Sequence, residues 1–202
     1  MCIRDSSIVV RQIAGYLLFV WRYRLKLQGI ENLPKSAPVL LLGNHISWID
    51  FALIQWATPR TIRFVVHEDY YNMLIFKWIL IAVGAVPIRP SNSRNAMHNI
   101  VSLLNKNCVV GIFPEGEIST NGELSDLKRG FEKILSESRD DVVVVPFAIN
   151  DMWGTFFSKA PKALKKKQKF CFRRDIHINI GPPLNVNATR SEVKKSISDL
   201  LI

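Results

Sequence analysis

The 202-residue chain is poor in cysteine, and its three cysteines have neither metal-ligand spacing nor the even count of a disulfide framework. These residues are Cys2, Cys108 and Cys171. A reducing compartment is therefore the simpler interpretation. Low-complexity tracts and repeats of fixed period are also missing, and 48% of the residues are hydrophobic, which excludes a disordered chain.

Acidic residues are scarce relative to basic ones, with 17 Asp and Glu against 27 Lys and Arg and a formal net charge of +10. This balance favours an anionic partner, whether nucleic acid, anionic lipid or an acidic protein. The sequence has no helix-turn-helix, zinc-finger or RNA-stacking signature, which argues against nucleic acid. Trp21, Trp48, Trp78 and Trp153 accompany the basic residues, as is typical of a membrane surface. The alternative is a soluble basic domain with solvated lysines.

The chain also lacks an uninterrupted apolar run of about twenty residues, the length that a helix needs to span a bilayer. Residues 13–21 are too few, and Lys77 interrupts residues 73–86. Both runs suit helices that lie in the membrane interface, line an acyl-chain cavity or pack in a core. We predict an amphipathic, membrane-associated helix over residues 8–26.

Residues 1–6 resemble a translated sequencing adapter, so we expect a single domain over residues 7–202 and a native chain that extends upstream. Hydrophobic periodicity predicts strands over residues 38–43, 61–66, 86–88, 108–113, 142–148 and 176–180. It predicts further helices over residues 50–57, 72–83, 93–106, 128–138 and 190–201. Alternating strands and helices indicate an α/β domain with a mixed, largely parallel sheet flanked by helices.

The segment from Asn44 to Asp50 follows an apolar strand and contains a histidine and an aspartate five residues apart. His45 has the chemistry of a general base, and Asp50 can accept the N–H of its other ring nitrogen and so fix tautomer and orientation. Ser47 can cap the next helix, and Asn44 can hold the turn. The alternative is a turn with a structural histidine.

A second polar segment, Phe113–Thr120, also follows a strand, so the fold can bring both segments to one edge of the sheet. Gly116 permits close backbone approach, and its N–H can face an anion. Glu115 can bind a substrate hydroxyl or complete a polar network around His45. Arg89 follows another strand, where a phosphate clamp would be useful, although a surface arginine is the simpler interpretation.

Four blocks, at residues 44–50, 84–89, 113–119 and 143–146, resemble in content and order the glycerolipid acyltransferases of the lysophosphatidic acid acyltransferase type. The resemblance covers nearly the whole chain from about residue 15. It implies His45 as general base with Asp50 as its partner, and Arg89, Glu115 and Gly116 as acceptor-site residues. We also count Asn44 and Ser47 as candidate substrate-binding residues.

The resemblance further implies an acyl thioester of coenzyme A or acyl carrier protein as co-substrate, without metal, cofactor or covalent enzyme intermediate. The chain departs from many members at Glu117-Ile118, where they carry Thr-Arg. A cation near the acceptor phosphate is missing, which favours a singly charged lysophospholipid phosphodiester. The alternative acceptor is 1-acylglycerol-3-phosphate.

Residues 115–124 and 151–158 look like one branch of the family, in which the domain is fused between a lysophospholipid transporter and an acyl–acyl carrier protein synthetase. Those proteins reacylate 2-acylglycerophosphoethanolamine. The resemblance places the chain at the cytoplasmic face of the inner membrane, peripheral or tethered by a fused transporter. Six lysines between Lys159 and Lys169 can dock on anionic lipid or acidic acyl carrier protein, or can form a solvated loop.

Two other functions compete with acyl transfer. One is a non-catalytic module that binds a lysolipid and passes it to fused domains, although such a module does not need His45, Asp50 and Glu115 together. The other is a hydrolase that activates water, although the sequence has no Gly-x-Ser-x-Gly elbow and no metal-ligand cluster.

Overall fold

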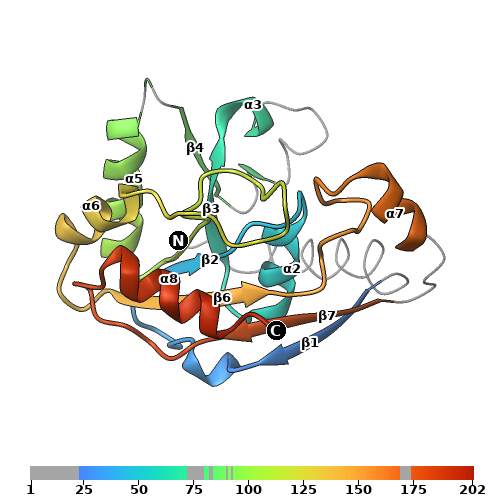
Figure 1. Ribbon diagram of the computed structural model, residues 1–202. Helices are drawn as coiled ribbons and strands as arrows, with labels where there is room; N and C mark the ends of the chain where they lie inside the picture. The colour runs from blue at the N-terminus through green and yellow to red at the C-terminus, as the bar shows by residue number, and fades with distance from the viewer. Residues whose placement is uncertain (1–22, 72–79, 82–83, 90, 92, 169–173) are drawn as a thin grey trace.

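The computed structural model describes residues 23–71, 80–81, 84–89, 91, 93–168 and 174–202. Its strands form a seven-stranded sheet in the order β1-β7-β6-β2-β5-β3-β4 (Figure 1). The strands are β1 (Tyr23–Gln28), β2 (Val39–Gly43), β3 (Ile62–His67), β4 (Val86–Ile88), β5 (Val109–Ile112), β6 (Val143–Ile149) and β7 (Arg174–Ile180). All neighbouring strands are parallel except β6 and β7, which confirms the predicted mixed, largely parallel sheet.

Helices cover both faces of this sheet. They are α2 (Asp50–Ala57), α3 (Glu68–Tyr71), α5 (Ser93–Asn105), α6 (Gly130–Ser136), α7 (Lys162–Gln168) and α8 (Arg190–Asp199), with the 3-10 turn η1 (Ile30–Asn32). Helix α2 packs on one face, and α5, α6 and α8 pack on the other. None of the helices in the described ranges has the length and apolar character needed to cross a bilayer.

The central strand β2 shows why the sheet is buried on both faces. All five of its residues are buried, as expected for a parallel strand between two helical layers. Successive side chains point to opposite faces, so Val39 and Leu41 join the core beneath α2. Leu40 and Leu42 join the core beneath α5, α6 and α8.

One predicted element is wrong in part. Residues 23–26, expected to close an amphipathic helix, belong to β1, where alternate residues are more and less buried. The segment Tyr-Arg-Leu-Lys-Leu-Gln alternates with a period of two, which suits a strand. Residues 8–22 of the predicted helix, and most of the helix predicted over 72–83, lie outside the described residues.

Parallel strands place their carboxyl ends at the same edge of the sheet. Strands β2, β3, β4, β5 and β6 all run in one direction, so the segments that follow them meet at this edge. The two polar segments follow β2 and β5, which are neighbours. The order of the strands therefore assembles the candidate site.

Candidate active site

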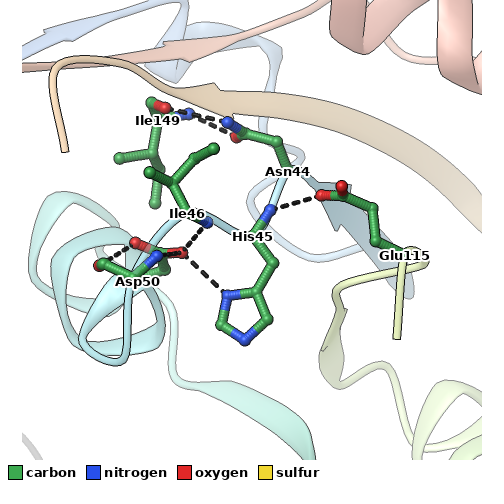
Figure 2. A network of polar contacts seen from close by, with 7 residues as sticks. Asn44, His45, Ile46, Asp50, Glu115 and Ile149 are labelled. Carbon is green, nitrogen blue, oxygen red and sulfur yellow. Dashed lines mark hydrogen bonds and ion pairs between the residues drawn. The ribbon is translucent and has the colours of Figure 1, made fainter. Parts of the chain in front are cut away.

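Backbone and side-chain contacts join the two polar segments at the edge of the sheet. The backbone N–H of Ser119 donates to the carbonyl oxygen of His45 at 2.8 Å. The carboxylate of Glu115 accepts the backbone N–H of His45 at 2.7 Å (Figure 2). These contacts fix the histidine backbone against the second segment.

Asp50 lies at the start of α2 and is fully buried. Its Oδ2 lies 2.9 Å from His45 Nδ1, and it also accepts the backbone N–H groups of Ile46 at 2.7 Å and Ser47 at 2.8 Å. The Ser47 hydroxyl donates to Oδ1. Four donors thus fix the orientation of the carboxylate, and a carboxylate facing Nδ1 selects the tautomer that carries its proton there.

The His45 ring is held in place but still reaches the surface. It stacks on Phe113 with 4.2 Å between ring centroids and an angle of 11° between ring planes. Its side chain is 18% exposed, whereas Asp50 is 0% exposed. Figure 2 shows the second ring nitrogen pointing away from Asp50. In the neutral ring this Nε2 is the proton acceptor, so it is available to a substrate hydroxyl.

Glu115 is buried, and both of its carboxylate oxygens accept backbone N–H groups. Oε1 accepts from His45 and Oε2 accepts from Ser125, each at 2.7 Å. Burial raises the pKa of this carboxyl above its ordinary value, against the opposing effect of the N–H groups of Ser125 and His45. Of its two predicted roles, the contacts describe the polar network around His45 rather than a hydroxyl-binding group.

Asn44 and Ser47, the two predicted substrate-binding residues of this segment, are both buried. Asn44 donates to the Ile149 carbonyl at 3.0 Å and accepts the Ile149 N–H at 2.8 Å, so it ties the end of β2 to β6. The prediction that Ser47 caps α2 is wrong, because its hydroxyl bonds Asp50 and the N-cap is Ile49, without a side-chain cap. Both side chains thus hold the His45–Asp50 segment from inside the protein.

Arg89 lies at the same sheet edge but outside this network. It follows β4 and forms an ion pair with Glu68, the first residue of α3. Strands β5 and β3 separate β4 from β2, so the two strand ends are roughly 14 Å apart at the usual strand spacing. The arginine side chain is half exposed.

Lys128, which the sequence did not single out, lies beside Gly116 in the structure. Its backbone N–H donates to the Pro114 carbonyl at 2.8 Å, and its side chain lies across Gly116. A Cβ added to Gly116, whose φ is 76°, would lie 2.5 Å from the Lys128 ammonium nitrogen. The loop between them carries no motif, so no sequence signal links the two residues.

Ile118, which replaces the arginine found in many members of the family, is buried. Its side chain is only 5% exposed, so an apolar group packs inward where many members carry arginine. Lys128, which is exposed, supplies a cation at the neighbouring glycine turn. The site thus combines a partly exposed histidine, paired with a buried carboxylate, with a positively charged, glycine-containing turn.

Comparison with known proteins gives a consistent result. The family model described as Acyltransferase matches residues 24–150. The chain is similar to the 1-acyl-sn-glycerol-3-phosphate acyltransferase of Borreliella burgdorferi, with 22% identity over 145 residues, 70% of this chain and 58% of that protein. It is also similar to the 1-acyl-sn-glycerol-3-phosphate acyltransferase alpha of Mus musculus, with 19% identity over 199 residues, 96% of this chain and 67% of that protein.

The chain spans between 46% and 58% of the length of the first three curated relatives that it matches. Its fold is similar to the crystal structure of the 1-acyl-sn-glycerophosphate (LPA) acyltransferase, PlsC, from Thermotoga maritima. The TM-score is 0.68 at 18% identity, covering 96% of this chain and 75% of that chain. At this identity the likeness establishes the fold.

Proposed function

Because the chain belongs to the Acyltransferase family, we propose that it moves a fatty acyl group from a thioester to the free hydroxyl of a lysophospholipid. The observation that carries this proposal is the His45–Asp50 pair, whose outer ring nitrogen faces away from the buried carboxylate at the sheet edge. Acyl transfer to an alcohol needs such a base, because the hydroxyl must lose its proton as it attacks.

In the proposed reaction, His45 Nε2 accepts the proton of the acceptor hydroxyl while that oxygen attacks the thioester carbonyl. The new C–O bond forms, the C–S bond breaks, and the imidazolium returns the proton to the departing sulfur. Asp50 holds the ring and stabilises the imidazolium, as carboxylates do in catalytic triads. The hydroxyl is itself the nucleophile, so the reaction needs neither a covalent enzyme intermediate nor a metal. The donor is an acyl thioester of coenzyme A or acyl carrier protein.

Two acceptors fit the proposal, and different observations favour them. Ile118 is apolar and buried where a second phosphate-binding cation is expected, which favours a lysophospholipid with a singly charged phosphodiester. The names of the relatives favour 1-acylglycerol-3-phosphate. In either case we assign the phosphate to the turn at Gly116, with Lys128 beside it and Arg89 at the far end of the edge.

We also propose that the protein works at the cytoplasmic face of the inner membrane. The net charge of +10 suits an anionic membrane surface, and tethering by a fused transporter, with a fused acyl carrier protein synthetase, follows from the family branch that the chain resembles. The nucleotide sequence upstream of residue 7 tests the fusion directly.

A product assay tests the proposed function. Labelled acyl-coenzyme A and acyl–acyl carrier protein are each combined with lysophosphatidic acid and lysophosphatidylethanolamine, and the diacyl product is measured for the wild type and His45→Ala. We expect His45→Ala to lower kcat by about 10²–10⁴-fold with an unchanged circular dichroism spectrum. The matched control is His98→Ala, an exposed histidine on α5, which should keep wild-type activity.

Three results would contradict parts of this proposal. Saturable lysolipid binding without thioester consumption would identify a binding module, and release of free fatty acid without diacyl product would identify a hydrolase. A strong preference for lysophosphatidic acid would reject the phosphodiester acceptor while leaving the acyl transfer proposal intact.

A further inference from the structure

We infer that the loop after β6, together with α7, forms a docking surface for an anionic lipid bilayer beside the active site. This inference rests on the proposed function, because a lipid substrate must reach His45 from a membrane. We call it the Phe156 surface and define it as Phe156 with the exposed lysines Lys159, Lys162 and Lys166.

The central feature of the Phe156 surface is a solvent-exposed aromatic side chain. Phe156 is 82% exposed, and Trp48, which follows His45 by three residues, is 40% exposed. Exposed large aromatics are unfavourable in a protein that meets only water, and they are typical of interaction sites and membrane interfaces. The Phe156 ring also packs edge-on against Phe157, with 5.4 Å between centroids.

The loop that carries Phe156 is held by its own hydrogen bonds. Met152 is fully buried, and its carbonyl accepts the Thr155 hydroxyl at 2.8 Å. The Ser158 hydroxyl donates to the Thr155 carbonyl at 2.9 Å and accepts the Gly154 N–H at 3.1 Å. The turn therefore presents Phe156 in a defined position instead of leaving it on a fraying loop.

The same loop is joined to the catalytic segment. The backbone N–H of Trp48 donates to the Phe157 carbonyl at 3.0 Å, and Ser47 forms an antiparallel bridge with Ser158. Ser47 in turn bonds Asp50. Figure 1 shows α7 beyond the end of β6, on the side of the molecule that carries α2. A membrane bound at the Phe156 surface would therefore lie next to the catalytic pair.

The charged side chains of the segment that carries Phe156 are all lysines. Residues 152–168 contain lysines but no aspartate or glutamate. The Lys165 ammonium donates to the Phe156 carbonyl at 3.3 Å, which places a cation at the backbone of this residue. An exposed aromatic side chain in a lysine-rich segment matches a bilayer that offers an apolar interface beneath anionic headgroups. Acidic acyl carrier protein would pair with the lysines but would not account for the exposed Phe156 ring. The exposed ring therefore favours a bilayer as the partner.

Vesicle binding tests the inference with the full chain and without substrates. Co-sedimentation is measured with phosphatidylcholine vesicles and with vesicles that also contain phosphatidylglycerol. We expect the double variant Lys162→Glu/Lys166→Glu to lose at least about 30-fold in affinity for the anionic vesicles. Phe156→Ser should lose about 10-fold on both vesicle types because it removes the inserted ring.

The matched control is Lys35→Glu/Lys106→Glu, which makes the same charge change at the opposite edge of the sheet, ahead of β2 and β5. It should bind anionic vesicles within about threefold of the wild type, since it alters net charge without altering the Phe156 surface. Equal losses in both double variants would show that net charge alone attracts the vesicles and would overturn the inference.

A second measurement separates this inference from the proposed function. Acyl transfer is assayed without vesicles, using water-soluble short-chain substrates on coenzyme A, where the docking variants should match the wild type. A wild type that binds vesicles in the expected pattern but transfers no acyl group would reject the function and keep the surface. Unchanged vesicle binding in the Lys162/Lys166 variant, with a raised KM for acyl–acyl carrier protein, would assign the surface to the carrier instead.

Discussion

At the scale of single residues, the site depends on how many donors each carboxylate accepts. Asp50 accepts two backbone N–H groups and a hydroxyl in addition to the His45 ring, and Glu115 accepts two backbone N–H groups. A buried carboxylate with several fixed donors cannot rotate freely, so it holds its neighbours in one geometry. Both acids therefore orient His45, Asp50 through its ring and Glu115 through its backbone.

Asp50→Asn should lower kcat by at least about 100-fold. The amide would turn an N–H₂ group toward a backbone N–H or the Ser47 hydroxyl, and it would stabilise the imidazolium less well than a carboxylate. Steady-state kinetics with a soluble acyl-coenzyme A substrate measure the effect. The control Asp199→Asn changes an exposed acid on α8 and should keep full activity. Normal turnover in Asp50→Asn would reject the orienting role.

Lys128→Met should raise the KM for the lysophospholipid by about 10-fold with little change in kcat, because one charge-assisted contact to the phosphate is lost. Methionine keeps the length of the side chain that crosses Gly116. Lys133→Met, on the exposed side of α6, is the matched control and should leave KM unchanged. An equal KM for Lys128→Met and wild type would remove Lys128 from the acceptor site.

At the scale of elements, the site is made by loops that hold neighbouring strand ends together. Asn44 connects β2 to β6, Glu115 connects the β2 and β5 segments, and the Trp48–Phe157 bond connects the β2 segment to the loop after β6. Each connection crosses between adjacent strands of a parallel sheet. Ligands of open α/β sheets usually bind at this carboxyl edge.

Asn44→Ala should destabilise the protein by on the order of 2–5 kcal/mol, because it leaves the buried N–H and carbonyl of Ile149 without partners. Urea denaturation followed by circular dichroism measures the free energy of unfolding. Asn187→Ala, at an exposed position between β7 and α8, should change it by less than about 0.5 kcal/mol. A similar small change for Asn44→Ala would show that water replaces the lost partners.

At the scale of the whole molecule, the buried Glu115 links stability to pH. Burial raises the pKa of its carboxyl above an ordinary value of about 4.5, so the folded state binds this proton more tightly than the unfolded state. The resulting contribution to stability is fully present below the ordinary pKa and is lost as pH rises through the raised pKa. The folded protein tolerates the ionised acid because the N–H groups of His45 and Ser125 solvate it.

Relative to Glu115→Gln, the free energy of unfolding of the wild type should therefore fall as pH rises across that window. Urea denaturation at a series of pH values measures this difference. For the control Glu31→Gln, at an exposed position in η1, the difference in free energy of unfolding from the wild type should not change with pH. If the free energy of unfolding of the wild type instead rose with pH relative to that of Glu115→Gln, the hydrogen bonds to Glu115 would outweigh burial in setting its pKa.

Much of the fold follows from local patterns along the chain. Apolar runs of four to seven residues predicted β2, β5 and β6, because a strand between two helical layers is buried on both faces. The prediction is wrong at residues 23–26. The apolar–polar alternation there follows an apolar segment, so the predicted helix over residues 8–26 includes residues that belong to β1. Helix and strand periods are hard to separate over so few residues.

The sequence by itself pointed to the His45–Asp50 pair, because the two residues are five positions apart where an apolar strand is followed by a helix, and the structure places their side chains in contact. Only the tertiary structure decided which distant groups complete the site. Glu115 lies 70 residues from His45, Ile149 lies 105 residues from Asn44, and Lys128 reaches Gly116 across a loop. Periodicity and caps are local properties, whereas strand order is set by long-range packing, so the sequence left two possible roles for Glu115 and only the folded sheet showed that it bonds the His45 backbone.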